Sequence, residues 1–83
     1  LSRKSLHLSR RIEVLSCRSI REKLLCFFHQ QAELSGSASF LLPFSLSALA
    51  EYISADRSAM MREMKKLREE SVIRTEGHRV TLL

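Results

Sequence analysis

Residues 46–65 read LSALAEYISADRSAMMREMK, and the spacing of their apolar residues predicts two short helices that cross at a tight turn. The buried stripe of the first helix is Leu46, Leu49, Ala50 and Ile53. Ser45 suits the N-cap of this helix, because its hydroxyl can accept a hydrogen bond from a backbone N–H of the first turn. We expect the turn over residues 54–56, with the small Ala50 where the two helices touch.

The second helix is predicted to run from about residue 57 to residue 70 and to have two different sides. Asp56 can cap its start, and Met60, Met64 and Leu67 are spaced to form its buried side. The outward side carries Arg57, Ser58, Met61, Arg62 and Lys65. Such a basic row is either an ordinary solvated helix surface or a surface that meets a polyanion.

A short strand is predicted before the first of these helices. Residues 40–42, FLL, form an apolar extended run that Pro43 halts, which is typical of an edge strand. Phe44 and Leu49 then stand at the two positions of a hydrophobic staple, which would fix the angle at which the chain enters the helix.

Farther upstream, residues 19–35 predict a core-forming helix. Ser19 and Glu22 have the spacing of a capping box, and the helix is expected to end near residues 35–37. The apolar positions at helical spacing are Ile20, Leu24, Phe27, Phe28 and Ala32. We expect Cys26 and His29 to be packing and surface residues, because zinc requires four converging N or S donors.

After the basic helix, residues 72–75 and 78–82 are β-rich and enclose Glu76-Gly77, which predicts a hairpin with a two-residue turn. Helix, short strand, helix, turn, helix and hairpin, in that order, make a winged helix-turn-helix. We therefore predict a mainly α fold with a small β hairpin, and assign residues 16–83 to it.

Residues 1–15 have a short heptad pattern, with leucines at Leu1, Leu8 and Leu15, Ile12 at one a position and Ser5 at the preceding one. Two interpretations stay open. The segment is either the end of a parallel dimerisation helix or an amphipathic helix that docks on its own domain.

Length and composition bound the function. Eighty-three residues suffice for one small core, and because the sequence starts at Leu1 we expect it to be part of a longer polypeptide. Cys17 and Cys26 have no CxxC spacing, so we expect their thiols to be reduced. Because the sequence has no apolar run long enough to span a membrane, we expect a cytoplasmic domain with no membrane contact. The net charge is +5, and its excess lies within residues 1–23.

The two-helix arrangement suggests how the outward side could read DNA. A helix held away from its own core can enter the major groove, which is about 12 Å wide. Arginine can donate two hydrogen bonds to guanine, so Arg57 and Arg62 are candidates to read bases. Ser58 could contact a base or a phosphate, and Met61 could pack on a thymine methyl group.

Other residues are candidates for phosphate contacts. Ser45 and Ser47 lie at the start of their helix, where backbone N–H groups and the helix dipole favour an anion. The further candidates are Lys65 on the basic helix and His78 and Arg79 on the hairpin.

The sequence LPFS at 42–45, LAEYI at 49–53, Arg57, REM at 62–64 and LREE at 67–70 resembles the carboxy-terminal domain of the Crp/Fnr family of bacterial transcription regulators. This resemblance implies a homodimer on pseudo-palindromic double-stranded DNA and an amino-terminal sensor domain, absent here, for an unknown small effector. RNA polymerase is a further candidate partner. No cofactor is expected in this domain.

The sequence departs from the family's pattern at three serines. Ser58 replaces a usual glutamate that can accept a hydrogen bond from cytosine, which changes the expected operator preference. Ser54 and Ser71 replace glycines that are frequent in the family, at the turn and before the hairpin.

Two alternatives to this interpretation remain. The chain could be a stand-alone winged-helix repressor of another family, or a winged helix that binds proteins and no specific DNA. An enzyme is not expected, because no arrangement of Ser, His and Asp and no glycine-rich phosphate loop is present, so no catalytic or metal-binding residue is assigned.

Overall fold

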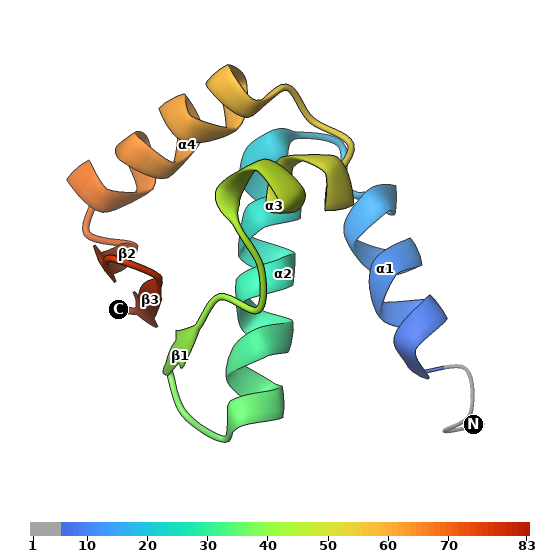
Figure 1. Ribbon diagram of the computed structural model, residues 1–83, viewed down its shortest axis with the longest axis horizontal. Helices are drawn as coiled ribbons and strands as arrows, with labels where there is room; N and C mark the ends of the chain where they lie inside the picture. The colour runs from blue at the N-terminus through green and yellow to red at the C-terminus, as the bar shows by residue number, and fades with distance from the viewer. Residues whose placement is uncertain (1–5) are drawn as a thin grey trace.

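Within residues 6–83 the chain forms four helices and one small antiparallel sheet, in the predicted order (Figure 1). The computed structural model describes the backbone of residues 6–83 and the side chains from Arg10 onward. The helices are α1 (Leu6–Ser16), α2 (Ile20–Ser35), α3 (Leu46–Tyr52) and α4 (Arg57–Glu69). The strands are β1 (Ser39–Leu41), β2 (Ile73–Glu76) and β3 (Arg79–Leu82). The fold is the predicted winged helix-turn-helix.

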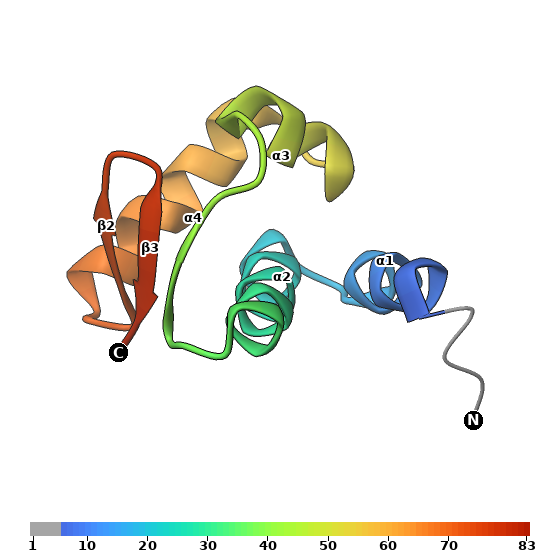
Figure 2. The same cartoon turned by 60° about the horizontal axis from the view of Figure 1, so that its bottom comes forward.

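Helix α2 is the centre of the domain. It lies between α1 on one side and α4 with the sheet on the other, as the two views agree (Figures 1 and 2). Its Leu24, Phe27 and Phe28 are buried, and they share one core with residues of every element from α3 to β3. The largest fully buried partners are Leu49, Ile53, Met60, Leu67, Ile73 and Val80.

The strand order is β1-β3-β2, so β1 is an edge strand, as the proline at position 43 predicts. The hairpin turn differs from the prediction. Glu76 is the last residue of β2 and pairs with Arg79, so the two-residue turn is Gly77-His78 and not Glu76-Gly77. Gly77 has φ 59°, which suits the first position of such a turn, and the shift places His78 at its tip.

The predicted helix starts are confirmed. The side chains of Ser19, Ser45 and Asp56 accept hydrogen bonds from the backbone N–H groups three residues on, at 3.1–3.2 Å. The capping box at the start of α2 is modified, because the Glu22 carboxylate accepts from the N–H of Arg18 and not from that of Ser19.

Phe44, the predicted staple residue, packs its ring against those of Phe27 and Tyr52, each with a centroid separation of 5.7 Å. The entry into α3 is therefore fixed to α2 by an aromatic cluster. Leu49 is fully buried in the core beside it.

Helix α1 docks on α2 through a residue outside the heptad pattern. Val14 is fully buried, whereas Ile12 is 65% exposed and Leu15 is half-buried. Gln30 of α2 donates to the backbone oxygen of Arg10 at 2.9 Å and to the Glu13 carboxylate at 3.0 Å. Of the other heptad positions, Leu1, Ser5 and the side chain of Leu8 lie outside the described residues.

Candidate nucleic-acid interface

The turn between α3 and α4 sets the direction of α4. The N–H of Ala55 donates to the carbonyl of Ala50 at 2.9 Å, and the N–H of Ser54 donates to that of Glu51 at 3.1 Å. Ser54 itself has φ 56°, a left-handed conformation that glycine adopts most easily. The position that is frequently glycine in the resembled family is therefore one where the backbone needs a positive φ.

The far end of α4 is closed in the same way. The N–H of Val72 donates to the carbonyl of Leu67 at 2.9 Å, that of Ser71 donates to Arg68 at 3.1 Å, and Ser71 has φ 60°. The Arg21 guanidinium of α2 also forms a two-pronged ion pair with the Glu70 carboxylate. This pair lowers the pKa of Glu70 through its hydrogen bonds and raises that of Arg21.

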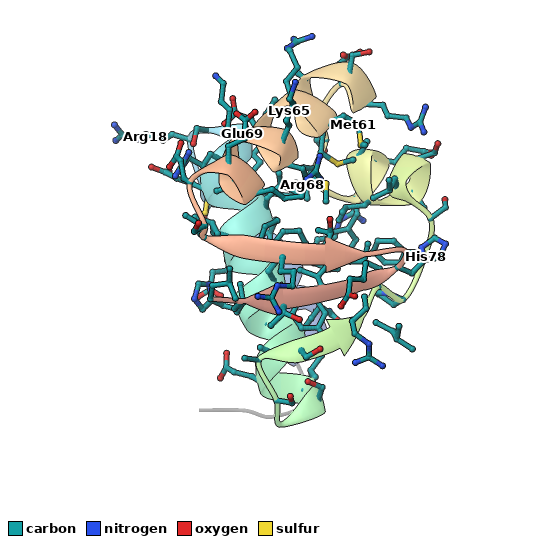
Figure 3. The ribbon with its side chains drawn as sticks, turned by 90° about the vertical axis from the view of Figure 1, so that its left-hand side faces the viewer. Arg18, Met61, Lys65, Arg68, Glu69 and His78 are labelled. Atoms are coloured by element: carbon teal, nitrogen blue, oxygen red, sulfur yellow. The ribbon has the colours of Figure 1, made fainter. Side chains whose placement is uncertain are left out.

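Between these fixed ends, α4 turns one side to the core and the other to solvent. Met60, Met64 and Leu67 are buried as predicted. Of the predicted base-reading residues, Arg57, Ser58 and Arg62 are exposed, and so is Lys65, the predicted phosphate contact. Met61 is half-buried and packs against the core, so only part of its side chain could meet a base. Figure 3 shows Met61 and Lys65 along this helix.

The positive charge of the outward side is not neutralised by ion pairs within the described part of the chain. The ion pairs found over residues 6–83 are Arg21–Glu70 and Lys66–Glu63, and neither includes a predicted contact residue. Three cations, Arg57, Arg62 and Lys65, therefore share one side of α4 and are available to phosphates or base edges.

The start of α3 has the predicted polar character. Ser45 and Ser47 are both exposed. The Ser45 hydroxyl accepts from the N–H of Ala48 at 3.2 Å, and the same hydroxyl can still donate its hydrogen to a phosphate oxygen. The N-cap role and a phosphate contact are thus compatible at this serine.

The two predicted hairpin residues are placed differently from each other. His78 lies exposed at the hairpin tip (Figure 3). Arg79 is also exposed, but its guanidinium donates to the Ser39 hydroxyl of β1 at 3.1 Å. A phosphate contact from Arg79 would have to share or replace that bond.

The sequence reasoning missed two further arginines. Arg68 on α4 and Arg74 on β2 are exposed and border an open depression of about 290 Å³, lined also by Ser71, Ile73, Thr75 and Leu83. Arg68 stands seven residues after Met61, so the helical spacing that selected the outward row could have found it. Arg74 could not be found in this way, because only the hairpin register places it beside the end of α4.

No helix over residues 6–83 is long and apolar enough to cross a membrane. In the same range, no three side chains of His, Cys, Asp or Glu gather as a metal ion would require.

A model of a known protein family matches most of this interface. The model of the family described as the Crp-like helix-turn-helix domain matches residues 22–83. The matched range includes both helices of the helix-turn-helix and the hairpin. No curated protein matches the sequence significantly.

Proposed function

The chain belongs to the Crp-like helix-turn-helix domain family, whose members are DNA-binding regulators, and on this premise we propose that it recognises a specific operator sequence and acts within an effector-responsive transcription regulator. The observation that carries the proposal is the outward side of α4. Its exposed cations have no ion-pair partner among the described residues, while its other side is anchored in the core.

In this proposal α4 enters the major groove with its amino-terminal turns leading. Arg57 and Arg62 read base edges, Ser58 contacts a base or phosphate, and the exposed part of Met61 packs on a thymine methyl group. A guanine read by two hydrogen bonds from arginine is discriminated by about 1–3 kcal/mol.

The phosphate contacts set the register of α4 in the groove without reading sequence. Ser45 and Ser47 approach one phosphate from the start of α3, and Lys65 approaches another from α4. His78 reaches the backbone from the hairpin tip, and Arg79 contributes if its bond to Ser39 opens. Each cation that contacts a phosphate displaces a counterion and steepens the salt dependence of binding.

A homodimer would present two such helices to an inverted repeat. Ile12 supports this part of the proposal, because it is a large apolar residue that α1 leaves 65% exposed while the same helix buries Val14 against its own domain. In the longer protein, an effector bound to a sensor domain would act on the spacing of the two α4 helices, and RNA polymerase would be a further partner.

The proposal is tested by selecting bound sequences from a random pool of duplex DNA with the complete polypeptide, with and without candidate small effectors. We expect enrichment of an inverted repeat whose half-site centres lie about 10–10.5 base pairs apart. Enrichment of single half-sites would support specific reading by α4 and contradict the homodimer.

The second candidate function is binding of a protein partner by the winged helix. The observation in its favour is that the half-buried Met61 lies beside the exposed cations of α4. Selection without enrichment under any effector condition would favour this alternative. A steep salt dependence without sequence preference would also contradict operator recognition.

A further inference from the structure

Two cysteines that are nine positions apart in the sequence meet at the junction between α1 and α2. The Sγ of Cys17, just after the end of α1, donates to the backbone oxygen of Glu13 at 3.5 Å. The Sγ of Cys26, in the second turn of α2, lies 3.8 Å from the carboxylate of the same Glu13. Both sulfurs therefore lie against the same residue of α1, one at its backbone oxygen and one at its carboxylate. Cys17 is also close enough to be one of the causes that raise the pKa of Cys26.

The two thiols differ in their surroundings. Burial, followed by the neighbouring Cys17 and Glu13, raises the pKa of Cys26 to about 11. At neutral pH the Cys26 thiol is therefore almost entirely protonated and reacts slowly as a first nucleophile. Cys17 is half-buried and lies in the short connection between the helices, where a small oxidant can reach it.

From this geometry we propose that Cys17 and Cys26 are a site of reversible oxidation, at which a peroxide converts the two thiols into a disulfide that ties α1 to α2. The sequence analysis expects reduced thiols from the spacing of the two cysteines alone. The structure adds that both sulfurs lie against Glu13. Neither the site nor its test depends on binding to DNA.

The reaction balances in two steps. The Cys17 thiol loses its proton, and the thiolate attacks one oxygen of hydrogen peroxide. The O–O bond breaks, Cys17 sulfenic acid forms, and the departing hydroxide takes up the proton lost by the thiol to become water. The Cys26 sulfur then attacks the sulfenic sulfur, the S–O bond breaks, and the oxygen leaves as a second water. The Glu13 carboxylate is placed to accept the proton that Cys26 gives up and to pass it to the departing hydroxide, which thereby becomes this second water. The protein loses two electrons and two protons, and one peroxide is reduced to two waters.

The position of the bond gives it a mechanical consequence. Without it, α1 is held to the rest of the domain by buried Val14, by the bonds of Gln30, and by the Arg11 guanidinium 5.2 Å from the centre of the Tyr52 ring. A disulfide adds a covalent tie at the end of α1 nearest the junction (Figure 1). The angle at which α1 leaves the domain is then fixed.

Peptide mapping tests the site directly. The full chain is treated with hydrogen peroxide, alkylated, and digested with trypsin in the absence of a reductant. Among its cleavage sites, trypsin cuts after Arg11, Arg18, Lys23 and Arg57. We expect a new species that links peptide 12–18 to peptide 24–57, an intact mass lower by two hydrogens, and loss of both changes on adding dithiothreitol. The intact chain must remain monomeric on a non-reducing gel, because a link between two chains would contradict the proposal.

Single variants test the assigned order. Cys26→Ser should stop the reaction at Cys17 sulfenic acid, which dimedone traps as a mass adduct on peptide 12–18. Cys17→Ser should leave Cys26 largely unlabelled over the same time. Equal labelling of the two variants would overturn the assigned roles, and over-oxidation of the original chain without the linked peptide would overturn the site.

Amide hydrogen exchange tests the mechanical consequence. Oxidation is expected to slow exchange in α1 several-fold while leaving that in α4 unchanged, and reduction should restore the original rates. Unchanged exchange in α1 of the disulfide-linked chain would show that the bond does not constrain the helix.

Discussion

Helices α4 and α1 are both amphipathic, but the domain holds them in very different ways. Three residues of α4 are buried in the core, its start is capped by Asp56, and its end is closed by the left-handed turn at Ser71. Glu70 beside this end is paired with Arg21. The described side chains of α1 include a single buried residue, Val14, and the helix contacts the domain mainly through α2. Its Ile12 remains in solvent.

This difference indicates two kinds of surface. A helix that reads bases must present its side chains in a fixed position, because a contact displaced by an ångström loses much of its specificity. The anchoring of α4 meets this demand. Apolar surface left exposed on α1 is instead suited to contact with another chain, and the attachment of α1 can be altered without disturbing the core.

The largest effect should come from removing part of the anchor of α4. Met60→Ala deletes a fully buried side chain of α4 and should lower the free energy of unfolding by about 2–5 kcal/mol, measured by urea denaturation. Ile12→Ala on α1 is the matched control, and a change within about 0.5 kcal/mol is expected because its side chain is exposed. Equal losses in the two variants would mean that α1 and α4 are anchored alike.

The next effect concerns the outward side of α4. Arg62→Ala should weaken operator binding by about 1–3 kcal/mol and relax preference at one base pair, while the unfolding free energy stays nearly constant. Arg10→Ala is the control, since it removes one positive charge from α1 on the other side of α2 (Figures 1 and 2). If both variants lose the same affinity for operator and for random DNA, charge alone explains the binding and α4 has no reading role.

The sequence predicts these two helices unequally well, for a physical reason. The caps at Ser19, Ser45 and Asp56 join atoms only three residues apart, so local spacing is sufficient to find them. The burial of Val14 is set by α2, and a heptad pattern in α1 cannot reveal which side α2 covers. The heptad pattern marks Ile12, which the fold leaves exposed, and it gives no sign that Val14 is the residue buried against α2.

The candidate site shows the same limit. Most of the outward row of α4 follows from helical periodicity, but the Arg21–Glu70 pair joins residues 49 positions apart and has no local signature. The observed hairpin turn lies one residue later than the predicted one, with Glu76 paired to Arg79. A two-residue hairpin turn needs a positive φ at its first central residue, which Gly77 has in the observed turn and Glu76 would need in the predicted one.

Replacing the serines that close α3 and α4 should sharpen the comparison by strengthening the anchor of α4. Ser54 and Ser71 occupy the same left-handed position that Gly36 occupies after α2, with the same pair of backbone hydrogen bonds. A residue with a side chain destabilises the folded state by about 1–2 kcal/mol when it adopts the left-handed conformation. Glycine removes this strain, but it also makes the unfolded chain more flexible, which offsets part of the gain in stability. Ser54→Gly and Ser71→Gly should each stabilise the domain by about 0.5–1 kcal/mol.

The reciprocal substitution controls for chain flexibility. Gly36→Ser places a side chain where no atom lies within 4 Å, so any loss of stability reflects the backbone conformation and not a clash. We expect Gly36→Ser to lower the melting temperature and the two serine-to-glycine variants to raise it. A lower melting temperature in Ser54→Gly or Ser71→Gly would show that the serine hydroxyl contributes more than its conformation costs.

The smallest effect should come from the ion pair at the end of α4. Both partners are solvent-exposed to a large extent, so water and salt screen their attraction. Because the pKa of Glu70 is lowered in the folded state, its contribution to stability is present above the ordinary glutamate value of about 4.3 and is lost as the pH falls through the lower folded value. Glu70→Gln should therefore be less stable than the original chain at neutral pH and equally stable in strong acid.

Glu69→Gln, which alters an exposed neighbour outside the ion pairs found over residues 6–83, should show no such pH-dependent difference. A Glu70→Gln deficit that is the same at both pH values would assign the effect to packing or hydrogen bonding and not to the charge that ties α4 to α2.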